Sequence, residues 1–212
     1  MEIALVIPVY NEETTIKKVI KEAFFYIKKI IVINDFSTDK TEIILKKLPV
    51  TIINNQRNLG YAKTLEKGIR RAFSSGSDYV ITFDADGQHK VSDLKKFISI
   101  IEKGKPDLVL GKRSFKNRFM EEVFGFYSKL RFGFSDPLCG MKAYKKSLFK
   151  KYGNLETKYS IATELTFRAI KDGAKYIEVP IQSEKRQTKS RFAGVLKGNM
   201  LELKAFLNIL FI

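Results

Sequence analysis

The sequence is poor in cysteine, histidine and long apolar runs, and each shortage argues against a class of protein. Cys139 is the only cysteine and His89 the only histidine among 212 residues. An internal disulfide is therefore impossible, and a zinc cluster is not expected. No run reaches the roughly 20 apolar residues that a membrane-spanning helix needs. The N-terminus meets Glu2 at once and lacks the basic segment of a signal peptide. We therefore expect a protein of a reducing compartment, the cytoplasm.

Two common nucleotide-binding patterns are also missing. Neither G-x-G-x-x-G nor G-x-x-x-x-G-K-[ST] occurs, which argues against dinucleotide sites of the Rossmann type and against P-loops. No internal repeat and no Ser/Gly/Pro-rich linker divides the chain, and 44% of its residues are hydrophobic. This content is ample for one buried core, so we expect a single domain.

The charge is strongly positive and unevenly distributed. Lys and Arg number 39 against 23 Asp and Glu, a net charge of +16, and most of the excess lies in residues 111–212. A surplus of this kind indicates an acidic partner for the second half: a nucleic acid, an anionic membrane surface or a phosphorylated small molecule. Solvated lysines, as in proteins of thermophiles, are the simpler alternative.

Short apolar runs alternate with helical patterns along the first half. Continuous runs are typical of strands buried on both faces, and the alternation predicts an α/β fold with a mostly parallel sheet between helices. A break follows at residues 112–142, which predict a loop and a short helix. The predicted strands are 3–8, 30–34, 50–54, 79–83, 107–111, 143–149 and 174–181, with a helix over 162–171.

Polar residues follow three of these strands at the point where each ends. The carboxyl ends of parallel strands meet at one edge of the sheet, where ligands bind. Crowded carboxylates repel unless a cation or a donor-rich ligand is present, and Mg²⁺ or Mn²⁺ prefers oxygen ligands. The sequence FDADGQH therefore predicts a metal site at Asp84, Asp86 and Gln88, although each residue taken singly could be a helix cap or a turn residue. His89 could bind metal or relay a proton, but a lone histidine is more often a hydrogen-bonded turn residue.

Seven motifs follow one another along the chain: VIPVYNE, VINDFSTDKT, NLGYAKTLEKG, FDADGQH, DLVLGKR, DPLCGMKAY and IEVPI. This ordered set resembles family-2 glycosyltransferases of the GT-A fold, and within them the polyprenol-phosphate sugar synthases typified by dolichyl-phosphate mannose synthase. The similarity runs from about Ile3 to Phe192. It implies a GT-A catalytic domain over 1–192, followed by a C-terminal segment over 193–212.

The resemblance implies a role for each matching residue. On the donor side, Pro8, Tyr10 and Glu12 line the nucleotide pocket, Asp35 hydrogen-bonds the base, Asp84 with Ala85 faces the ribose or sugar, and Asp86 and Gln88 hold the metal. On the acceptor side, Arg113 approaches a phosphate, Asp136 lies at the sugar–acceptor junction, and Glu164 lines the same cleft. Arg186, Ser190 and Arg191 cover the diphosphate. Three positions depart from the family pattern: Thr188 replaces glycine, Arg191 replaces lysine and Phe124 replaces arginine.

The implied reaction is transfer of a sugar, with inversion, from a nucleoside diphosphate sugar of the GDP-mannose or UDP-glucose type to a polyprenyl or dolichyl phosphate. A phosphate acceptor is already ionised and needs no strong base, whereas a hydroxyl acceptor needs one, and Asp136 is the first candidate. Transfer to a soluble or hydroxyl acceptor is one alternative. A non-enzymatic nucleic-acid-binding domain is another, against which the edge carboxylates argue because they would repel phosphate.

The last residues predict an amphipathic helix. Apolar side chains fall at helical spacing on one side: Leu196, Met200, Leu203, Phe206, Leu207 and Leu210. This helix either packs on the core or in a dimer, or lies in the bilayer interface beside the cleft. In the second case the protein is peripheral on the cytoplasmic face of the membrane.

Overall fold

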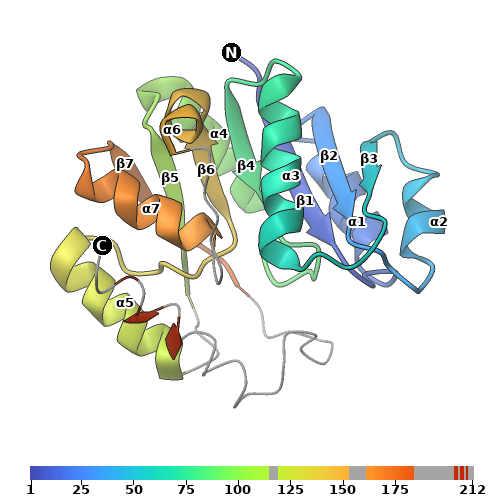
Figure 1. Ribbon diagram of the computed structural model, residues 1–212. Helices are drawn as coiled ribbons and strands as arrows, with labels where there is room; N and C mark the ends of the chain where they lie inside the picture. Colours follow the sequence, from blue (N-terminus) through green and yellow to red (C-terminus); the bar gives the residue numbers. More distant parts are fainter. Residues whose placement is uncertain (115–118, 153–160, 184–202, 205, 208, 210–212) are drawn as a thin grey trace.

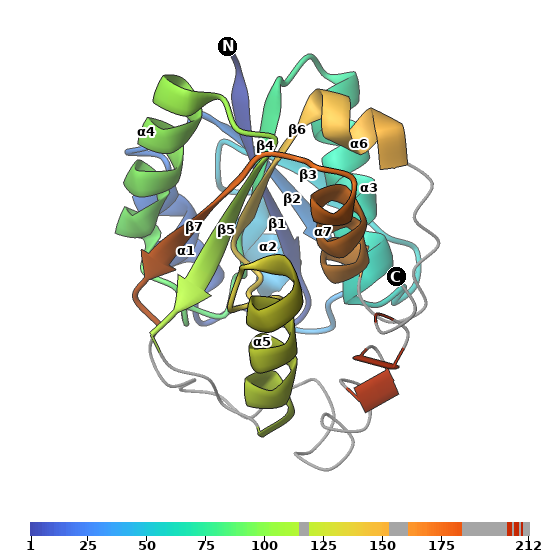
Figure 2. The same ribbon diagram turned by 90° about the vertical axis from the view of Figure 1, so that its left-hand side faces the viewer.

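A seven-stranded sheet between two layers of helices forms the computed structural model of the chain (Figures 1 and 2). The structure describes residues 1–114, 119–152, 161–183, 203, 204, 206, 207 and 209. The strands are β1 (Ile3–Val9), β2 (Lys29–Asn34), β3 (Thr51–Asn54), β4 (Tyr79–Thr82), β5 (Leu108–Arg113), β6 (Lys142–Lys145) and β7 (Tyr176–Ile181). The helices are α1 (Ile16–Ala23), α2 (Thr41–Leu45), α3 (Tyr61–Ser74), α4 (Leu94–Gly104), α5 (Phe119–Phe132), α6 (Lys146–Tyr152) and α7 (Ile161–Lys171), with a 3₁₀ turn over Val91–Asp93 before α4.

The sheet is parallel except for one strand. Its order is β3-β2-β1-β4-β6-β5-β7, and β6 pairs antiparallel with both β4 and β5. The chain runs outward from β1 to β2 and β3, and then β4 returns to the other side of β1. The order of strands therefore switches between β1 and β4, where open α/β sheets bind their ligands. Because β5 and β7 run in the same direction as β4, their carboxyl ends meet the same edge.

Side chains of alternate residues in each strand point into two separate apolar cores. In β1, Leu5 and Ile7 face the core under α1, α2 and α4, while Ala4 and Val6 face the core under α3 and α7. Each of these four side chains is fully buried. Burial on both faces is the reason that the parallel strands have continuous apolar sequences. The mostly parallel sheet flanked by helices confirms the predicted fold class.

One predicted strand is partly wrong. The sequence 143–149 was expected to be a single strand, but β6 ends at Lys145 and α6 begins at Lys146. The Lys146 N–H donates to the carbonyl of Asp78, which turns the chain at this point. Leu148 and Phe149 then reach the α3 side of the core from the helix rather than from a strand. The segment predicted as a loop with a short helix contains α5, a helix of 14 residues.

The described residues near the C-terminus pack on α5. The Phe206 ring lies 5.2 Å from the rings of both Phe124 and Tyr127, measured between centroids, and Ile209 is buried. Leu203 and Leu207 are exposed. The predicted helix thus has apolar side chains on two sides, one of which contacts the domain's own core. Among the described residues, no helix is long and apolar enough to span a bilayer.

Candidate active site

The loops that follow β1 and β2 hold each other in place. The Asn11 N–H donates to Ser37 Oγ at 3.0 Å, and the Thr38 N–H donates to Asn11 Oδ1 at 2.7 Å. The Glu12 N–H donates to Thr41 Oγ1 at 2.8 Å. Asn11 has a φ of 54°, a left-handed conformation that asparagine adopts more readily than most residues. These hydrogen bonds anchor the loop after β1. Of the predicted pocket residues, Pro8 at the end of β1 and Glu12 in the loop are buried, and Tyr10 is exposed.

Asp35 is buried and holds the loop before α3. Its Oδ1 accepts hydrogen bonds from Asn55 Nδ2 and the Leu59 N–H, both at 2.8 Å, and its Oδ2 accepts from the Gly60 N–H at 2.9 Å. A buried carboxylate needs donors of this kind to offset its desolvation. Contact between Asp35 and the nucleotide base stays a prediction. The hydrogen bonds from Asp35 to the loop before α3 were not indicated by the sequence.

Asp84 and Asp86, the two carboxylates that follow β4, differ in their surroundings. Tyr61 Oη donates to Asp84 Oδ1 at 2.8 Å, and His89 Nε2 lies 3.7 Å from Asp84 Oδ2. Burial alone raises the pKa of Asp84, but His89 and Tyr61 outweigh it and keep that pKa below its ordinary value. Asp86 Oδ1 accepts from the Gln88 N–H at 3.0 Å.

The donor set fits a divalent cation that completes its shell with ligand oxygens. Carboxylates at an open edge are hard oxygen donors, and Mg²⁺ typically takes one or two of them together with phosphate oxygens. No group of three or more His, Cys, Asp or Glu side chains in the described part of the chain is placed to hold a metal by itself. Asp86 and Gln88 also line a cavity of about 490 Å³ between α1 and the loop after β4.

Because Gly140 has no side chain, the carboxylate of Asp84 can lie directly against it. A Cβ atom added to Gly140 would fall on the carboxylate of Asp84, so only glycine allows this approach. The neighbouring hydroxyl of Thr82 donates to the Gly140 carbonyl at 2.7 Å. The segment that follows Asp136 is therefore packed directly against Asp84, so that Asp84 and the segment of Asp136 lie next to each other.

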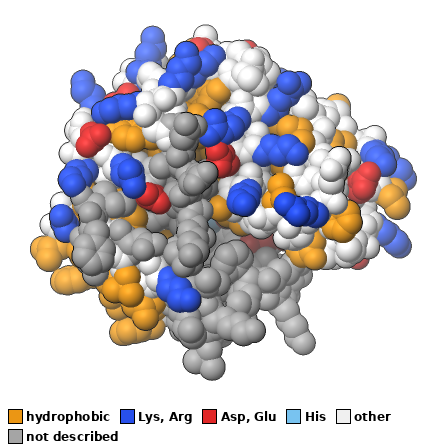
Figure 3. All heavy atoms as spheres, in the orientation of Figure 1, with side chains coloured by type: hydrophobic (Ala, Val, Ile, Leu, Met, Phe, Trp, Pro, Cys, Tyr) orange, Lys and Arg blue, Asp and Glu red, His pale blue; other side chains and the backbone are white. Residues whose placement is uncertain are grey.

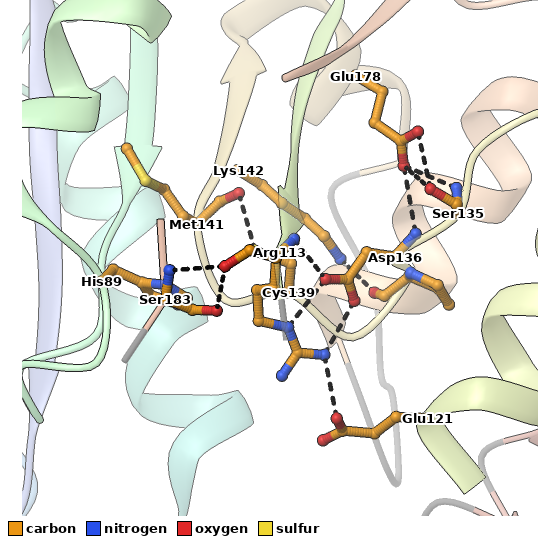
Figure 4. A network of polar contacts seen from close by, with 12 residues as sticks. His89, Arg113, Glu121, Ser135, Asp136, Cys139, Met141, Lys142, Glu178 and Ser183 are labelled. Atoms are coloured by element: carbon orange, nitrogen blue, oxygen red, sulfur yellow. Dashed lines mark hydrogen bonds and ion pairs between the residues drawn. The ribbon is translucent and has the colours of Figure 1, made fainter. Parts of the chain in front are cut away.

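Arg113 and Asp136 form a bidentate ion pair at the end of β5 (Figure 4). Arg113 Nε donates to Asp136 Oδ2 at 2.8 Å, Nη2 donates to Oδ1 at 2.9 Å, and the Arg113 N–H donates to Oδ2 at 2.9 Å. Glu121 of α5 lies 3.5 Å from the same guanidinium. Burial lowers the pKa of Arg113, but the hydrogen bonds and charge of Asp136 outweigh it and raise that pKa. Arg113 is therefore charged at neutral pH.

The first turn of α7 contacts the same segment. Glu164 forms an ion pair with Arg168 at 2.7 Å within the helix, and the preceding Thr163 donates from Oγ1 to the Pro137 carbonyl at 3.2 Å. Glu164 therefore directly follows, in the sequence, a residue that contacts the segment of Asp136. Arg186, Ser190 and Arg191 lie outside the described residues.

Sequence reasoning missed two charged residues at this site. Lys142 is 1% exposed and donates from Nζ to the Pro137 carbonyl at 2.7 Å, and burial lowers the pKa of this lysine to about 8. Glu178 accepts hydrogen bonds from Ser135 and Asp136. The sequence did contain one signal for Glu178: it is a charged residue inside the otherwise apolar strand sequence YIEVPI of β7.

The chain matches known glycosyltransferases over most of its length. Residues 4–153 match the profile of glycosyl transferase family 2. The chain belongs to this family. A UDP-N-acetylglucosamine–dolichyl-phosphate N-acetylglucosaminyltransferase of Methanococcus voltae is 31% identical over 85% of this chain and 85% of its own length. A polyprenol monophosphomannose synthase of Mycolicibacterium smegmatis is 24% identical over 86% of this chain and 77% of its own.

Solved structures show the same fold. Glucosyl-3-phosphoglycerate synthase of Mycobacterium tuberculosis, crystallised with Mn²⁺, UDP and glucosyl-3-phosphoglycerate, superposes with a TM-score of 0.76 at 18% identity, over 99% of this chain and 78% of its own. This likeness establishes the GT-A fold. As a family-2 glycosyltransferase, the protein is an enzyme, which confirms the activity class that its motifs predicted.

Replacement of Gly140 by alanine tests the contact with Asp84. Gly140→Ala should weaken nucleotide-sugar binding on the order of tenfold, a loss of about 1.4 kcal/mol, because the added methyl group displaces the carboxylate. Gly104→Ala is the matched control, since the atom nearest to its added Cβ is Pro106 Cδ at 3.9 Å. Calorimetric titration measures both dissociation constants. Equal affinities for the two variants would contradict the packing argument.

Proposed function

We propose that this enzyme transfers a sugar, with inversion at the anomeric carbon, from a nucleoside diphosphate sugar to a polyprenyl phosphate. The observation that carries this proposal is the bidentate pair of Arg113 and Asp136 beside the aspartates that follow β4. Two relatives support it by their names, which include dolichyl phosphate for the Methanococcus voltae enzyme and polyprenol for the Mycolicibacterium smegmatis enzyme.

The ion pair favours a phosphate acceptor over a hydroxyl acceptor. Both oxygens of Asp136 accept hydrogen bonds from Arg113, and a carboxylate paired in this way is a weak base. A hydroxyl group needs a base to become a good nucleophile. A phosphate monoester has a second pKa of about 6 and is ionised at neutral pH without help. Its oxygen attacks the anomeric carbon, and the bond from that carbon to the donor diphosphate breaks.

Arg113 is the residue that we assign to the acceptor phosphate. Its guanidinium contacts Asp136 through two short hydrogen bonds, whereas Glu121 is the more distant partner at 3.5 Å. An incoming phosphate would replace Glu121 and leave the contact with Asp136 intact. The exposed Lys112 lies on the same strand end and adds positive charge there.

The donor occupies the edge between β1 and β4 in this proposal. Asp86 and Gln88 would hold Mg²⁺ or Mn²⁺, which offsets the charge that develops on the leaving diphosphate. The pocket for the nucleotide and the sugar is assigned to Pro8, Tyr10, Glu12, Asp35, Asp84 and Ala85, with Glu164 on the acceptor side. Arg186, Ser190 and Arg191 are assigned to the diphosphate.

An exposed apolar stripe on α5 supports a location at the membrane surface. Phe119, Phe126 and Leu130 lie on one side of the helix and are 75%, 73% and 79% exposed. Figure 3 shows apolar side chains gathered at the lower left, where α5 lies in Figure 1. The opposite side of α5 carries Glu121, which contacts Arg113. We propose that this stripe rests on the cytoplasmic face of a bilayer, which would keep the site on the other side of α5 close to lipid acceptors.

The donor and metal assignments are tested together by Asp86→Ala. The wild type should gain thermal stability with one class of nucleotide sugar, UDP- or GDP-linked, and more so with Mn²⁺ present. It should also transfer the labelled sugar to a short-chain isoprenyl phosphate. Asp86→Ala should lose at least about 100-fold in transfer rate, because a charge on the leaving group is no longer offset. Its unfolding temperature without ligands should stay close to wild type, since Asp86 is not part of either apolar core.

Three outcomes would contradict the metal or the acceptor assignment. Transfer by Asp86→Ala at the wild-type rate, or wild-type transfer that persists with EDTA, would exclude the metal role. Transfer to a short-chain isoprenol or to 3-phosphoglycerate, with none to the isoprenyl phosphate, would exclude the lipid phosphate as acceptor.

The membrane assignment is tested by charge substitution on α5. The double variant Phe126→Asp/Leu130→Asp should sediment with anionic vesicles about tenfold less than wild type, since apolar area and positive charge both contribute to such binding. Phe25→Asp is the matched control, because Phe25 is 83% exposed beyond the end of α1. If the control and the double variant lose binding equally, or if wild type does not bind at low salt, α5 is not the docking surface.

A further inference from the structure

The segment that carries Asp136 is held from two opposite sides (Figure 4). On one side, Glu178 Oε1 accepts from the Ser135 N–H at 2.6 Å and from the Asp136 N–H at 3.2 Å, and the Ser135 hydroxyl lies 2.9 Å from Oε2. On the other side, the Pro137 carbonyl accepts from Lys142 Nζ at 2.7 Å and from Thr163 Oγ1 at 3.2 Å. Three consecutive residues are thus fixed by side chains from β7, β6 and α7.

The position of Glu178 follows from strand register. In the pairing of β7 with β5, Glu178 lies opposite Leu110, three residues before Arg113. Two residues earlier on β7, Tyr176 donates from Oη to the carbonyl of Phe132, the last residue of α5. The same face of β7 therefore anchors the end of α5 and the start of the segment 135–137. A carboxylate that accepts two backbone N–H groups and a hydroxyl makes stronger bonds than a neutral acceptor would.

We propose that Glu178 is a positioning residue, which sets the orientation of Asp136 and, through the ion pair, that of Arg113. This inference rests on the proposed function in one respect, the assignment of Arg113 to the acceptor phosphate. The pair needs matched planes, because Nε and Nη2 of Arg113 donate to the two different oxygens of Asp136. Rotation of the peptide between Ser135 and Asp136 would turn the carboxylate out of that plane. Glu178 accepts from the N–H of Asp136, which belongs to this peptide, and from the N–H of Ser135 just before it, and so opposes the rotation.

Glu178→Gln keeps the size of the side chain but removes its charge. The amide has one accepting oxygen in place of two: its oxygen can still accept from the two N–H groups, more weakly without the charge, while its NH₂ group takes the place of Oε2 and the Ser135 hydroxyl has to turn to accept from it. The first readout is the NMR signal of the Arg113 Nε–H group in protein labelled with ¹⁵N-arginine, assigned with Arg113→Lys. In wild type this proton should exchange slowly with water, because it is hydrogen-bonded to Asp136. In Glu178→Gln it should exchange at least about tenfold faster as the pair loosens.

The second readout is the kinetics of transfer. Glu178→Gln should lower kcat by roughly 10- to 100-fold, the size of effect that a misplaced reacting group produces, while the KM for the donor stays within about twofold. Asp107→Asn is the matched control: its Oδ2 accepts from the Lys175 N–H at 3.0 Å, at the opposite end of the same strand pair. The control should leave both readouts unchanged. Ser135→Ala, which removes only the hydroxyl, should shift both readouts in the same direction by a smaller factor and serves if Glu178→Gln does not fold.

Each outcome decides between the two proposals. An unchanged Arg113 signal in Glu178→Gln, or in Ser135→Ala if only that variant folds, overturns the positioning role. An equal loss in the Asp107→Asn control overturns it as well, because the effect would then be one of general stability. Faster exchange in Glu178→Gln together with a wild type that transfers no sugar to isoprenyl phosphate supports the positioning role and rejects the proposed function.

Discussion

The buried ion pair between Arg113 and Asp136 is the interaction on which the acceptor side of the site depends. It joins the end of β5 to the segment before β6, and it connects through Glu121 to α5. Two charges removed from water cost several kcal/mol each, and loss of one partner costs roughly 3–5 kcal/mol, because it leaves the other charge buried and alone. A pair of this kind contributes little net stability. Its retention at the edge of the sheet fits a role in binding charge.

In the proposed reaction, the same pair would let a strongly basic protein present one fixed cation to an anionic acceptor. Lysines on the surface are solvated and screened, whereas Arg113 is fixed by hydrogen bonds and shielded from water. Its side chain is only 12% exposed. The donor side that we propose uses the opposite sign, with Asp84 and Asp86 assigned to the cation and the sugar donor. Gly140 brings the two sides together, since it lies against Asp84 in the segment that follows Asp136.

Most of the fold could be predicted because parallel strands buried on both faces have continuous apolar sequences. Two elements could not. β6 has four residues and includes the buried Lys142, and its antiparallel direction is set by its neighbours β4 and β5. α5 has phenylalanine on both sides, with Phe124 in the core and Phe126 exposed, so its sequence lacks the one-sided pattern of a surface helix.

Candidate site residues that belong to a family motif could be predicted from the sequence. Residues that only the fold brings to the site could not. Asp84, Asp86, Arg113 and Asp136 come from the family motifs. Glu178 and Lys142 lie 42 and 6 residues from Asp136 in the sequence, and their relation to its segment depends on the strand order β6-β5-β7. Tyr61 reaches Asp84 in the same way, from the first turn of α3. Such contacts need the register of the sheet before they can be recognised.

In the proposed reaction the acceptor brings its own negative charge, so that no base on the enzyme is needed. The most direct measurement is the pH dependence of kcat/KM for two acceptors with the same isoprenyl chain, one a phosphate and one a phosphonate with a higher second pKa. We expect kcat/KM to rise through the second ionisation of the acceptor, near pH 6 for the phosphate, and the midpoint to move to higher pH with the phosphonate. A midpoint at the same pH for both acceptors would show instead that a group on the enzyme acts as the base.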